Sequence, residues 1–254
     1  MTQRIVEQLK RIQGLARSLV IYQRPGRQKP LQALYSQFVH NGDLVFDLGA
    51  HLGDRTMAFV GLGATVVAVE PNPGMMLWLR RLVTRKERVV FLTEAVGSQP
   101  GAAEMALSYR TPSVSSLAAG WRETLKTRAP GFRKIQWERA ITVEVITLDE
   151  MIARYGVPDF CKIDVEGFEP EVLAGLTCPV PALSFEFVSG ALDQAILCLK
   201  ELERLGEYKF NAIEGEQRSF LWPAWQSADQ IRRWLASGAT DIASGDLYAR
   251  LVSS

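Results

Sequence analysis

Two acidic residues and two glycines stand at the ends of apolar runs, where they could hold a nucleotide-like ligand. The run that contains Asp47 is followed by Gly49 and Gly53, and a second apolar run ends at Glu70. Glycine permits a sharp turn beneath a ligand because it has no Cβ, and the amides of the next helix then face that turn. Glu70 lies 17 residues beyond Gly53, which predicts a βαβ unit with a ribose-binding carboxylate.

The spacing within the turn indicates which nucleotide is bound. The order Asp47-x-Gly49-x-x-x-Gly53 differs from the Gly-x-Gly-x-x-Gly of plain NAD sites. An acid two residues before the first glycine favours a ligand with a cationic amino group. S-adenosylmethionine (SAM) has an amino-acid tail and no phosphate, whereas NAD has no such amine beside its pyrophosphate. The pattern therefore favours SAM, with Glu70 on both ribose hydroxyls.

Composition sets the broad class of the protein. The chain has 254 residues, of which 47% are hydrophobic and 22% charged, as in an ordinary soluble α/β domain. With 29 basic and 28 acidic residues, nothing in the overall charge favours a nucleic acid partner. Three cysteines without a CxxC pair are interpreted as free thiols in a reducing cytoplasm. No apolar run approaches the roughly 20 residues of a membrane span, and no signal-peptide core is recognisable, so a cytoplasmic location is expected.

Residues 1–42 are predicted to be a helical preamble. One amphipathic helix is expected first, and the segment 31–38 predicts a second, short helix. We expect the first helix to pack on the main domain or on a partner chain, with association with a membrane surface as the alternative. Its apolar stripe is Ile5, Leu9, Ile12, Leu15 and Leu19, and its basic face is Arg4, Lys10, Arg11 and Arg17.

The main domain is expected over 43–254. Its apolar runs alternate with helix-like segments, which is typical of a doubly wound α/β fold with a parallel sheet. A capping box at Thr147–Glu150 predicts a short helix to Tyr155, and a longer helix is expected over 191–205. The expected strands are 44–48, 65–70, 88–92, 159–164, 182–187, 208–213 and a closing strand around 247–251.

The alternating pattern is interrupted between about 97 and 146. Residues 103–108 and 141–145 alternate like half-exposed strands, while 111–137 is polar and loop-like. We interpret this insertion as a substrate-facing lid, with a plain surface insertion as the alternative. A connection containing Trp222, Trp225 and Trp234 precedes the closing strand.

Four motifs together resemble those of the FkbM-type SAM-dependent methyltransferases. The resemblance extends from about residue 43 to residue 176, and its most specific motif is Lys-Ile-Asp-Val-Glu-Gly-Phe-Glu at 162–169. It implies a Rossmann-like class I methyltransferase fold, in which a mostly parallel seven-stranded sheet has helices on both faces and an antiparallel last strand. SAM would lie at the carboxyl ends of the first strands. The other motifs are Val45–Gly53, Val69-Glu70-Pro71 and Ala95-Val96-Gly97.

The resemblance also implies which residues hold the cofactor. The methionine end of SAM is assigned to Asp47, Gly49, Ala50 and Gly53, with Thr56 helping from the following helix. Glu94 departs from the family pattern, in which asparagine is more frequent, and a solvated loop acid is its alternative role. For Asp47 the alternative is a structural role in capping its turn. Glu70 and Pro71 would border the ribose, and Asn72, Glu94 and Ala95 would border the adenine.

Candidate catalytic residues follow the fourth strand. Asp164 lies at the strand end, where ligands sit in open α/β sheets, and Glu166 is two residues further on. Two carboxylates so close raise one pKa, which suits a general base. Asp164 is also placed in the cofactor set. The pair could equally bind the hydroxyls of the acceptor or a divalent metal, although nothing else in the sequence indicates a metal. His51 is a third candidate, as a base or as a residue that packs over the cofactor.

Three further charged residues near this strand have less specific assignments. Glu169 is expected to favour the next helix N-terminus, and Lys162 to pair with a neighbouring acid. Glu186 is an acid within an apolar strand and needs a partner if it is buried.

These observations predict a SAM-dependent methyltransferase. By resemblance, its acceptor is a hydroxyl of a sugar or a small secondary metabolite, and the product an O-methyl ether. Two alternatives stay open at this point: a nicotinamide-dependent oxidoreductase, and a methyltransferase-fold scaffold that binds without catalysis. A small-molecule or glycan partner is expected, with no nucleic acid, and the oligomeric state is open.

Overall fold

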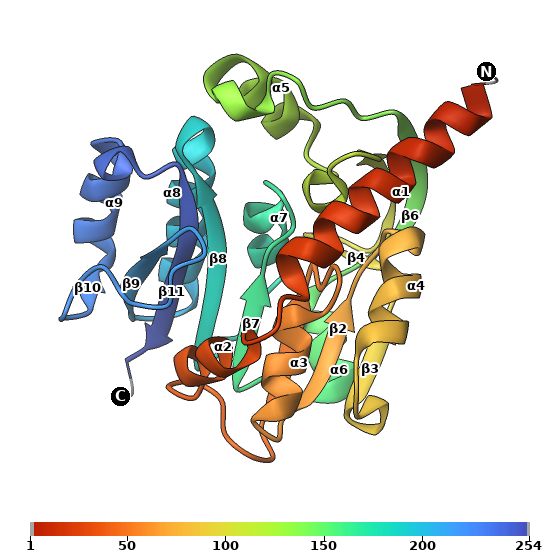
Figure 1. The fold of residues 1–254 in the computed structure, drawn as a ribbon. Helices are drawn as coiled ribbons and strands as arrows, with labels where there is room; N and C mark the ends of the chain where they lie inside the picture. Colours follow the sequence, from red (N-terminus) through yellow and green to blue (C-terminus); the bar gives the residue numbers. More distant parts are fainter. Residues whose placement is uncertain (1–2, 253–254) are drawn as a thin grey trace.

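One large sheet forms the centre of the molecule (Figure 1). The computed structural model describes residues 3–252. Within them, eight strands pair in the order β10-β9-β11-β8-β7-β1-β2-β3. The neighbours from β8 to β3 are parallel, whereas β11 is antiparallel to both β8 and β9. The strands are β1 (Leu44–Leu48), β2 (Thr65–Val69), β3 (Val89–Leu92), β7 (Phe160–Ile163), β8 (Ala182–Val188), β9 (Tyr208–Glu214), β10 (Gln226–Ser227) and β11 (Ser244–Leu251).

The predicted mostly parallel sheet with an antiparallel last strand is confirmed. The sequence indicated seven strands, and the described residues contain an eighth, because β10 pairs antiparallel with β9 at the edge of the sheet. A strand of two residues has no alternation of apolar and polar side chains to recognise, so the sequence pattern did not reveal it.

Helices cover both faces of this sheet. Helices α2, α3 and α4 share a core cluster with one face, and α6, α7, α8 and α9 share the main cluster with the other. The helices are α1 (Gln3–Tyr22), α2 (Gln28–Tyr35), α3 (Asp54–Gly61), α4 (Pro73–Leu82), α5 (Ala119–Arg128), α6 (Leu148–Tyr155), α7 (Glu169–Ala174), α8 (Leu192–Leu205) and α9 (Ala228–Ala236).

The twofold period of the strands sends the polar strand residues to one face. Phe46 and Ile163 pack in the cluster of α6 to α9, so their neighbours Asp47 and Lys162 point to the face that carries α2 and α3. Asp47 pairs in register with Lys162, and Lys162 with Ser184. The sheet therefore gathers its buried polar groups on one side.

The N-terminal helices pack on the domain in different ways. Helix α2 places Leu31, Leu34 and Tyr35 in the core cluster of β1 and α3. Helix α1 crosses the front of the molecule (Figure 1) but turns Leu9 and Ile12 to solvent. The prediction that α1 packs on the domain is confirmed, although its polar side makes the contact. The side chain of Arg4 lies outside the described part of the structure.

The insertion contains more regular structure than the sequence suggested. A small sheet of β4 (Ala95–Val96), β5 (Gly101–Leu107) and β6 (Arg139–Ile146) confirms the two predicted strands. The interpretation of 111–137 as a loop is wrong over α5. That helix has few apolar residues, but Trp121 and Leu125 are buried together with Val188 of β8. Tertiary packing, rather than periodicity, stabilises it.

The Trp-rich connection likewise contains a helix, α9. Ser227 accepts a hydrogen bond from the Gln230 amide, and the Gln230 side chain accepts one from the Ser227 amide. This capping box, with Gln at the third helical position, was the signal that the sequence offered for the helix. The equivalent box at α6, between Thr147 and Glu150, is confirmed.

Candidate functional site

The turn between β1 and α3 is built on left-handed backbone conformations. Gly49 and Gly53 have φ angles of 78° and 79°, and His51 has a φ angle of 50°. A Cβ at Gly49 would collide with the carbonyl oxygen of Asp164, so only glycine lets this turn lie against the end of β7. The Gly49 amide donates to the Val69 carbonyl at 3.0 Å, which ties the turn to β2.

Asp47 is a fully buried carboxylate, and one of its two oxygens accepts no hydrogen bond from the described residues. Its Oδ2 accepts a hydrogen bond from the Thr56 hydroxyl at 2.5 Å, whereas Oδ1 has no hydrogen-bond partner among the described residues. Burial raises the pKa of Asp47, and Lys162 and Thr56 oppose that rise. Asp47 lines a cavity of about 470 Å³. A buried, unsatisfied carboxylate oxygen beside a cavity favours a cationic donor from a ligand.

Glu70 joins the ends of the first two strands. Its Oε2 accepts a hydrogen bond from the His51 amide at 2.9 Å, and its Oε1 accepts one from the Asn72 amide at 2.8 Å. Burial raises the pKa of Glu70 to about 7, although both amides favour its charged form. Each oxygen keeps a lone pair for a ligand hydroxyl.

The other predicted cofactor residues divide into two groups. Four of them lie outside the cavity lining. Thr56 supports Asp47, Gly53 precedes α3, and the Asn72 side chain accepts a hydrogen bond from the Gly74 amide at the start of α4. Glu94 is not among the lining residues, and its Oε1 lies 3.9 Å from Arg154. Those that line the cavity are Asp47, Gly49, Ala50, His51, Glu70, Pro71, Ala95 and Asp164.

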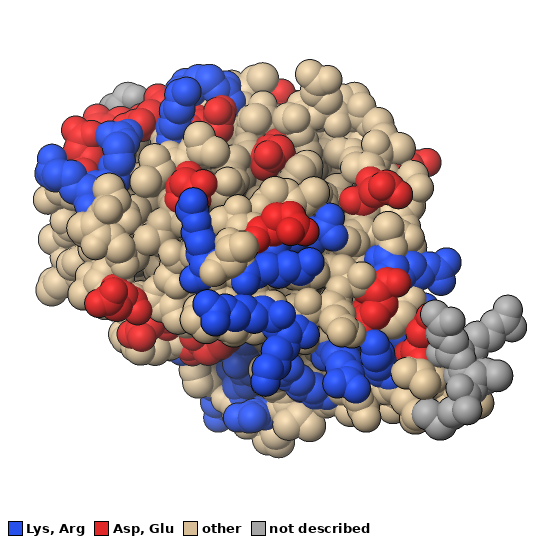
Figure 2. Space-filling model, turned by 90° about the horizontal axis from the view of Figure 1, so that it is seen from above, with Lys and Arg blue, Asp and Glu red and all other residues tan. Residues whose placement is uncertain are grey.

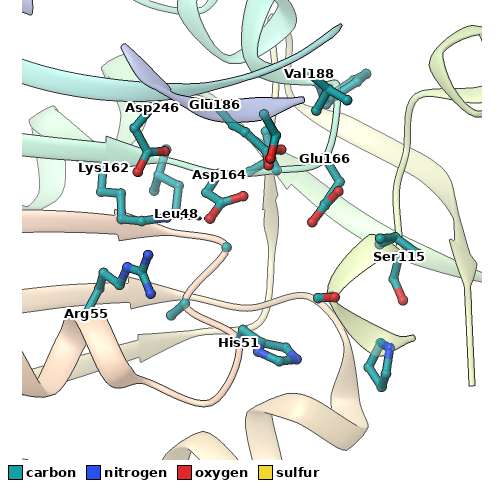
Figure 3. Close-up of a pocket in the computed structure, with 18 of the residues that line it drawn as sticks. Leu48, His51, Arg55, Ser115, Lys162, Asp164, Glu166, Glu186, Val188 and Asp246 are labelled. Atoms are coloured by element: carbon teal, nitrogen blue, oxygen red, sulfur yellow. Dashed lines mark hydrogen bonds and ion pairs between the residues drawn. The ribbon is translucent and has the colours of Figure 1, made fainter. Parts of the chain in front are cut away.

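Three carboxylates meet at the far wall of the cavity. One oxygen each of Asp164, Glu166 and Glu186 lies within 4.8 Å of the others. Figure 3 shows these side chains pointing toward one another, with His51 and Arg55 on the opposite wall. The set has the donor chemistry to hold a divalent cation or several ligand hydroxyls.

Burial and mutual repulsion set the protonation of this wall. Burial raises the pKa of Glu166 well above its usual range, and the nearby Asp164 raises it further. Burial raises the pKa of Glu186 in the same way, with Glu166 and Asp164 adding to it. Lys162 donates to Asp164 Oδ2 at 2.7 Å and is itself buried, so the predicted pairing of Lys162 with an acid is confirmed. Glu166 and Glu186 therefore exchange protons at higher pH than ordinary carboxylates do.

Glu169 has a structural position beside this wall. It is the first residue of α7, and its Oε1 accepts hydrogen bonds from the amides of Val165 at 2.9 Å and Gly167 at 3.3 Å. Burial raises its pKa to about 7. Glu169 thereby closes the turn that carries Glu166, whose φ angle is 58°.

His51 faces the cavity as a neutral imidazole. Burial lowers its pKa to about 4, and its buried Nε2 has no hydrogen-bond partner among the described residues. Its ring lies edge-on to Tyr22 with 5.1 Å between centroids. His51 is therefore held in place by packing while one nitrogen stays available to a ligand.

Several cavity residues were not predicted from the sequence. Tyr22 comes from the end of α1 and Asp246 from β11. Two stretches of the insertion that was interpreted as substrate-facing, 112–115 and 129–132, also line the cavity. Arg55 lies two residues after Gly53, and this proximity to the glycine turn was the signal that could have indicated it. The others are brought in by elements far apart in the sequence, and no local pattern marks them.

Arg55 belongs to a network that closes the cavity beside α3. It pairs with Asp54 and, at 3.1 Å, with Glu216, and Arg27 reaches the same two carboxylates at 2.8 and 2.7 Å. Burial alone would raise the pKa of Glu216, but Arg55 and Arg27 lower it to about 2. The network joins α2, α3 and the loop after β9 around the cavity.

Comparison with known proteins identifies the family. The Methyltransferase FkbM domain matches residues 47–239. The chain belongs to this family. Membership of a methyltransferase family favours a methyltransferase over the nicotinamide-dependent oxidoreductase.

A curated relative is similar over part of its length. The hexuronic acid methyltransferase AglP of Haloferax volcanii is 29% identical over 165 residues, which are 64% of this chain. The chain spans 62% of the length of that relative.

Solved methyltransferase structures resemble the chain more distantly. The precorrin-6y C5,15-methyltransferase of Geobacter metallireducens has a TM-score of 0.46 at 13% identity, covering 87% of this chain and 86% of that one. An O-methyltransferase from Bacillus cereus in complex with SAH has a TM-score of 0.42 at 14% identity, covering 99% and 92%. The strand order and the family match, rather than these distant likenesses, establish the fold.

The residues at the β1 end fit SAM. The unsatisfied Oδ1 of Asp47 suits the amino group of its methionine tail, and Glu70 suits the ribose hydroxyls. The close approach at Gly49 leaves no side chain in the way. The FkbM-family enzyme therefore has the polar groups that this cofactor needs at one end of its cavity and the carboxylate wall at the other.

Within residues 3–252 no helix is both long and apolar enough to cross a bilayer.

Proposed function

We propose that this enzyme methylates a hydroxyl group of a sugar or a similar polyhydroxylated metabolite and forms an O-methyl ether. The observation that carries the proposal is the wall of Asp164, Glu166 and Glu186, whose oxygens lie within 4.8 Å of one another. Converging carboxylates are suited to adjacent hydroxyl groups, each of which donates one hydrogen bond. The similarity to a hexuronic acid methyltransferase supports an acceptor of the sugar class.

The chain's own residues bind and orient the reactants. Asp47 holds the amino group of the cofactor and Glu70 holds its ribose, so the groups on either side of the sulfonium are fixed. Bound SAM supplies an electrophilic methyl group on its sulfonium. The remaining task of the protein is to align the acceptor oxygen and to remove its proton.

Glu166 takes the proton of the acceptor in this proposal. Its raised pKa makes it a stronger proton acceptor than an ordinary carboxylate once it is ionised. Lys162 fixes one oxygen of Asp164, whose other oxygen orients the hydroxyl. His51, with a free nitrogen on the opposite wall, is the second candidate for the base.

Substitutions separate cofactor binding from turnover. Asp47→Ala is expected to abolish binding of S-adenosylhomocysteine in calorimetry. Glu166→Gln and Asp164→Ala are expected to retain that binding and to lower turnover by about 10²- to 10⁴-fold, the usual contribution of acid–base catalysis. Turnover is measured as S-adenosylhomocysteine released in the presence of hexoses, hexuronic acids and phenols.

Asp193→Asn on α8 is the control, because this acid is exposed and belongs to neither end of the cavity. Asp193→Asn should leave both the binding of S-adenosylhomocysteine and the turnover unchanged. Turnover with phenols and with no sugar would overturn the acceptor class. If Asp164→Ala and Glu166→Gln both turned over at the normal rate, the carboxylate wall would have no catalytic role.

A further inference from the structure

Helix α1 presents its apolar side to solvent. Ten large apolar side chains are exposed among the described residues, and five of them belong to this one helix. We call four of these the α1 stripe. Their spacing of three, four or eight residues puts them on one side of the helix. The α1 stripe is Ile5, Leu9, Ile12 and Val20, with exposed fractions of 47, 45, 57 and 63%.

The opposite, polar side of α1 makes the contacts with the domain. Lys10 pairs with Glu138 at 3.1 Å, and Arg11 donates to the Tyr109 hydroxyl at 2.7 Å. Gly14 lies so close to the backbone of Tyr109 that a Cβ would collide with its carbonyl oxygen. These contacts fix the rotation of the helix, so the α1 stripe cannot turn inward without losing them.

A groove extends this apolar surface toward α4. It has a volume of about 400 Å³ and lies between α1, α4 and β6. Leu15, Trp78 and Ile141 line it, and so does Leu77, which is 50% exposed. Ile12 belongs both to the groove and to the α1 stripe, so the two surfaces are continuous. Soluble proteins rarely expose a continuous apolar surface without a partner for it.

Arginines surround this surface. Arg11 and Arg139 line the groove, the Arg81 guanidinium lies 5.2 Å from the centre of the Trp78 ring, and Arg17 projects from α1. Within residues 3–252, none of these four is within 4.0 Å of a carboxylate in an ion pair. Their charge is therefore available to a partner.

The positive charge is concentrated on this part of the molecule. Residues 3–22 and 110–139 contain eleven Lys and Arg against three Asp and Glu, whereas the rest of the chain contains eighteen against twenty-five. Figure 2 shows a band of Lys and Arg across the lower middle of the face seen from above.

We propose that α1 docks on an anionic membrane surface, with the α1 stripe in the lipid interface and the arginines on lipid phosphates. An amphipathic helix lying in the interface plane combines these two contacts, and guanidinium groups bind phosphate well. A second copy of the chain fits this face poorly, because a twofold axis would bring the same arginines against each other. The proposal does not depend on the identity of the methyl acceptor.

Docking would bring the cavity to the membrane surface. Helix α1 ends at Tyr22, which lines the cavity and contacts His51. The docked helix and the wall of the site are therefore parts of one element.

The test is binding of the full chain to lipid vesicles. Vesicles of equal parts phosphatidylcholine and phosphatidylglycerol should sediment the protein at least tenfold better than phosphatidylcholine alone, and high salt should weaken that binding. Leu9→Asp should reduce the binding at least tenfold. Arg17→Gln should reduce it about fivefold, the effect of one basic residue near an anionic surface.

Leu197→Asp on α8 is the matched control, because Leu197 is also 45% exposed and lies away from α1. It should leave vesicle binding unchanged, and all three variants should bind S-adenosylhomocysteine normally, which shows that they are folded. Three results would overturn the proposal: no preference for the anionic vesicles, equal binding by Leu9→Asp and the unchanged chain, or a dimer in light scattering that Leu9→Asp dissociates.

Discussion

At the scale of single residues, two features of the Glu70 environment change its pKa in opposite directions. It accepts hydrogen bonds from the amides of His51 and Asn72, which favour the charged form, while its burial favours the neutral form. The result is a pKa of about 7. The carboxylate that is expected to hold the ribose therefore changes its charge within the physiological range.

Cofactor affinity should depend on pH through Glu70. Below about pH 7 the folded protein holds a proton on Glu70, and above it the carboxylate is ionised and accepts hydrogen bonds more strongly. Affinity for S-adenosylhomocysteine should thus rise with pH and fall by up to about tenfold per pH unit below the pKa. Calorimetry at a series of pH values on both sides of pH 7 measures this affinity.

The matching variants identify the group that titrates. Glu70→Gln should bind more weakly at high pH and should lose the dependence on pH. Glu169 also has a pKa of about 7 but lies at the start of α7, so Glu169→Gln should keep the dependence. A pH dependence that survives in Glu70→Gln would exclude Glu70 as its origin.

Residues of the site could be predicted where the chemistry is local in sequence. Asp47, Gly49 and Glu70 lie in short motifs with fixed spacing, and the structure brings all three to one cavity. Tyr22 and Asp246 arrive from opposite ends of the chain. Their position depends on how α1 and β11 pack, and no spacing along the sequence encodes that.

At the scale of elements, the β1–α3 turn depends on a close approach between two strand ends. Gly49 has a left-handed φ angle and lies against the backbone of Asp164. Gly26 has a similar φ angle of 83°, but a Cβ there would meet nothing within 4 Å. Both glycines therefore need a left-handed backbone conformation, but only Gly49 also needs to lack a Cβ because of its contact with Asp164.

Alanine substitutions at these glycines separate the two effects. Gly26→Ala should cost about 1–2 kcal/mol, the strain of a left-handed residue, and shift the melting temperature by a few degrees. Gly49→Ala should cost more than about 3 kcal/mol, since the collision with Asp164 adds to that strain, and should remove cofactor binding. Thermal unfolding and calorimetry check both. Equal losses in the two variants would contradict the steric account.

Helix α5 was missed in the sequence for a physical reason that did not affect the parallel strands. The strands of the parallel sheet are mostly apolar and are recognisable as short runs, so β1, β2, β7 and β8 were predicted closely. Helix α5 buries only Trp121 and Leu125, and its contacts come from β8 and the segment after it. Its stability is tertiary, and the sequence alone did not reveal it.

At the scale of the whole molecule, charge is divided between the inside and the outside of the site. Among the described residues, eight acidic side chains line the cavity, but only two cations, Arg55 and Lys162, line it with them. The segments 3–22 and 110–139, which contribute to the cavity wall, are strongly basic on the outside. Because the basic and acidic residues nearly cancel in the total charge, composition does not reveal that the acids lie inside the site and the bases outside it.

The acidic interior should discriminate between two acceptors of the same shape. A hexuronic acid differs from its hexose by one carboxylate, and a further negative charge about 5 Å from the carboxylate wall costs ~3 kcal/mol at an effective dielectric constant of 20. The neutral hexose should therefore be methylated at least about tenfold faster than the uronic acid in a direct competition, read by mass spectrometry of both products.

A chelator should leave hexose turnover unchanged, because Lys162 and the raised pKa values of Glu166 and Glu186 already moderate the charge of the wall. If the uronic acid were preferred and the chelator abolished its turnover, the three carboxylates would instead hold a cation that binds the acceptor. Glu186→Gln distinguishes these results, since it should narrow the preference for the hexose in the first case and weaken metal-dependent turnover in the second.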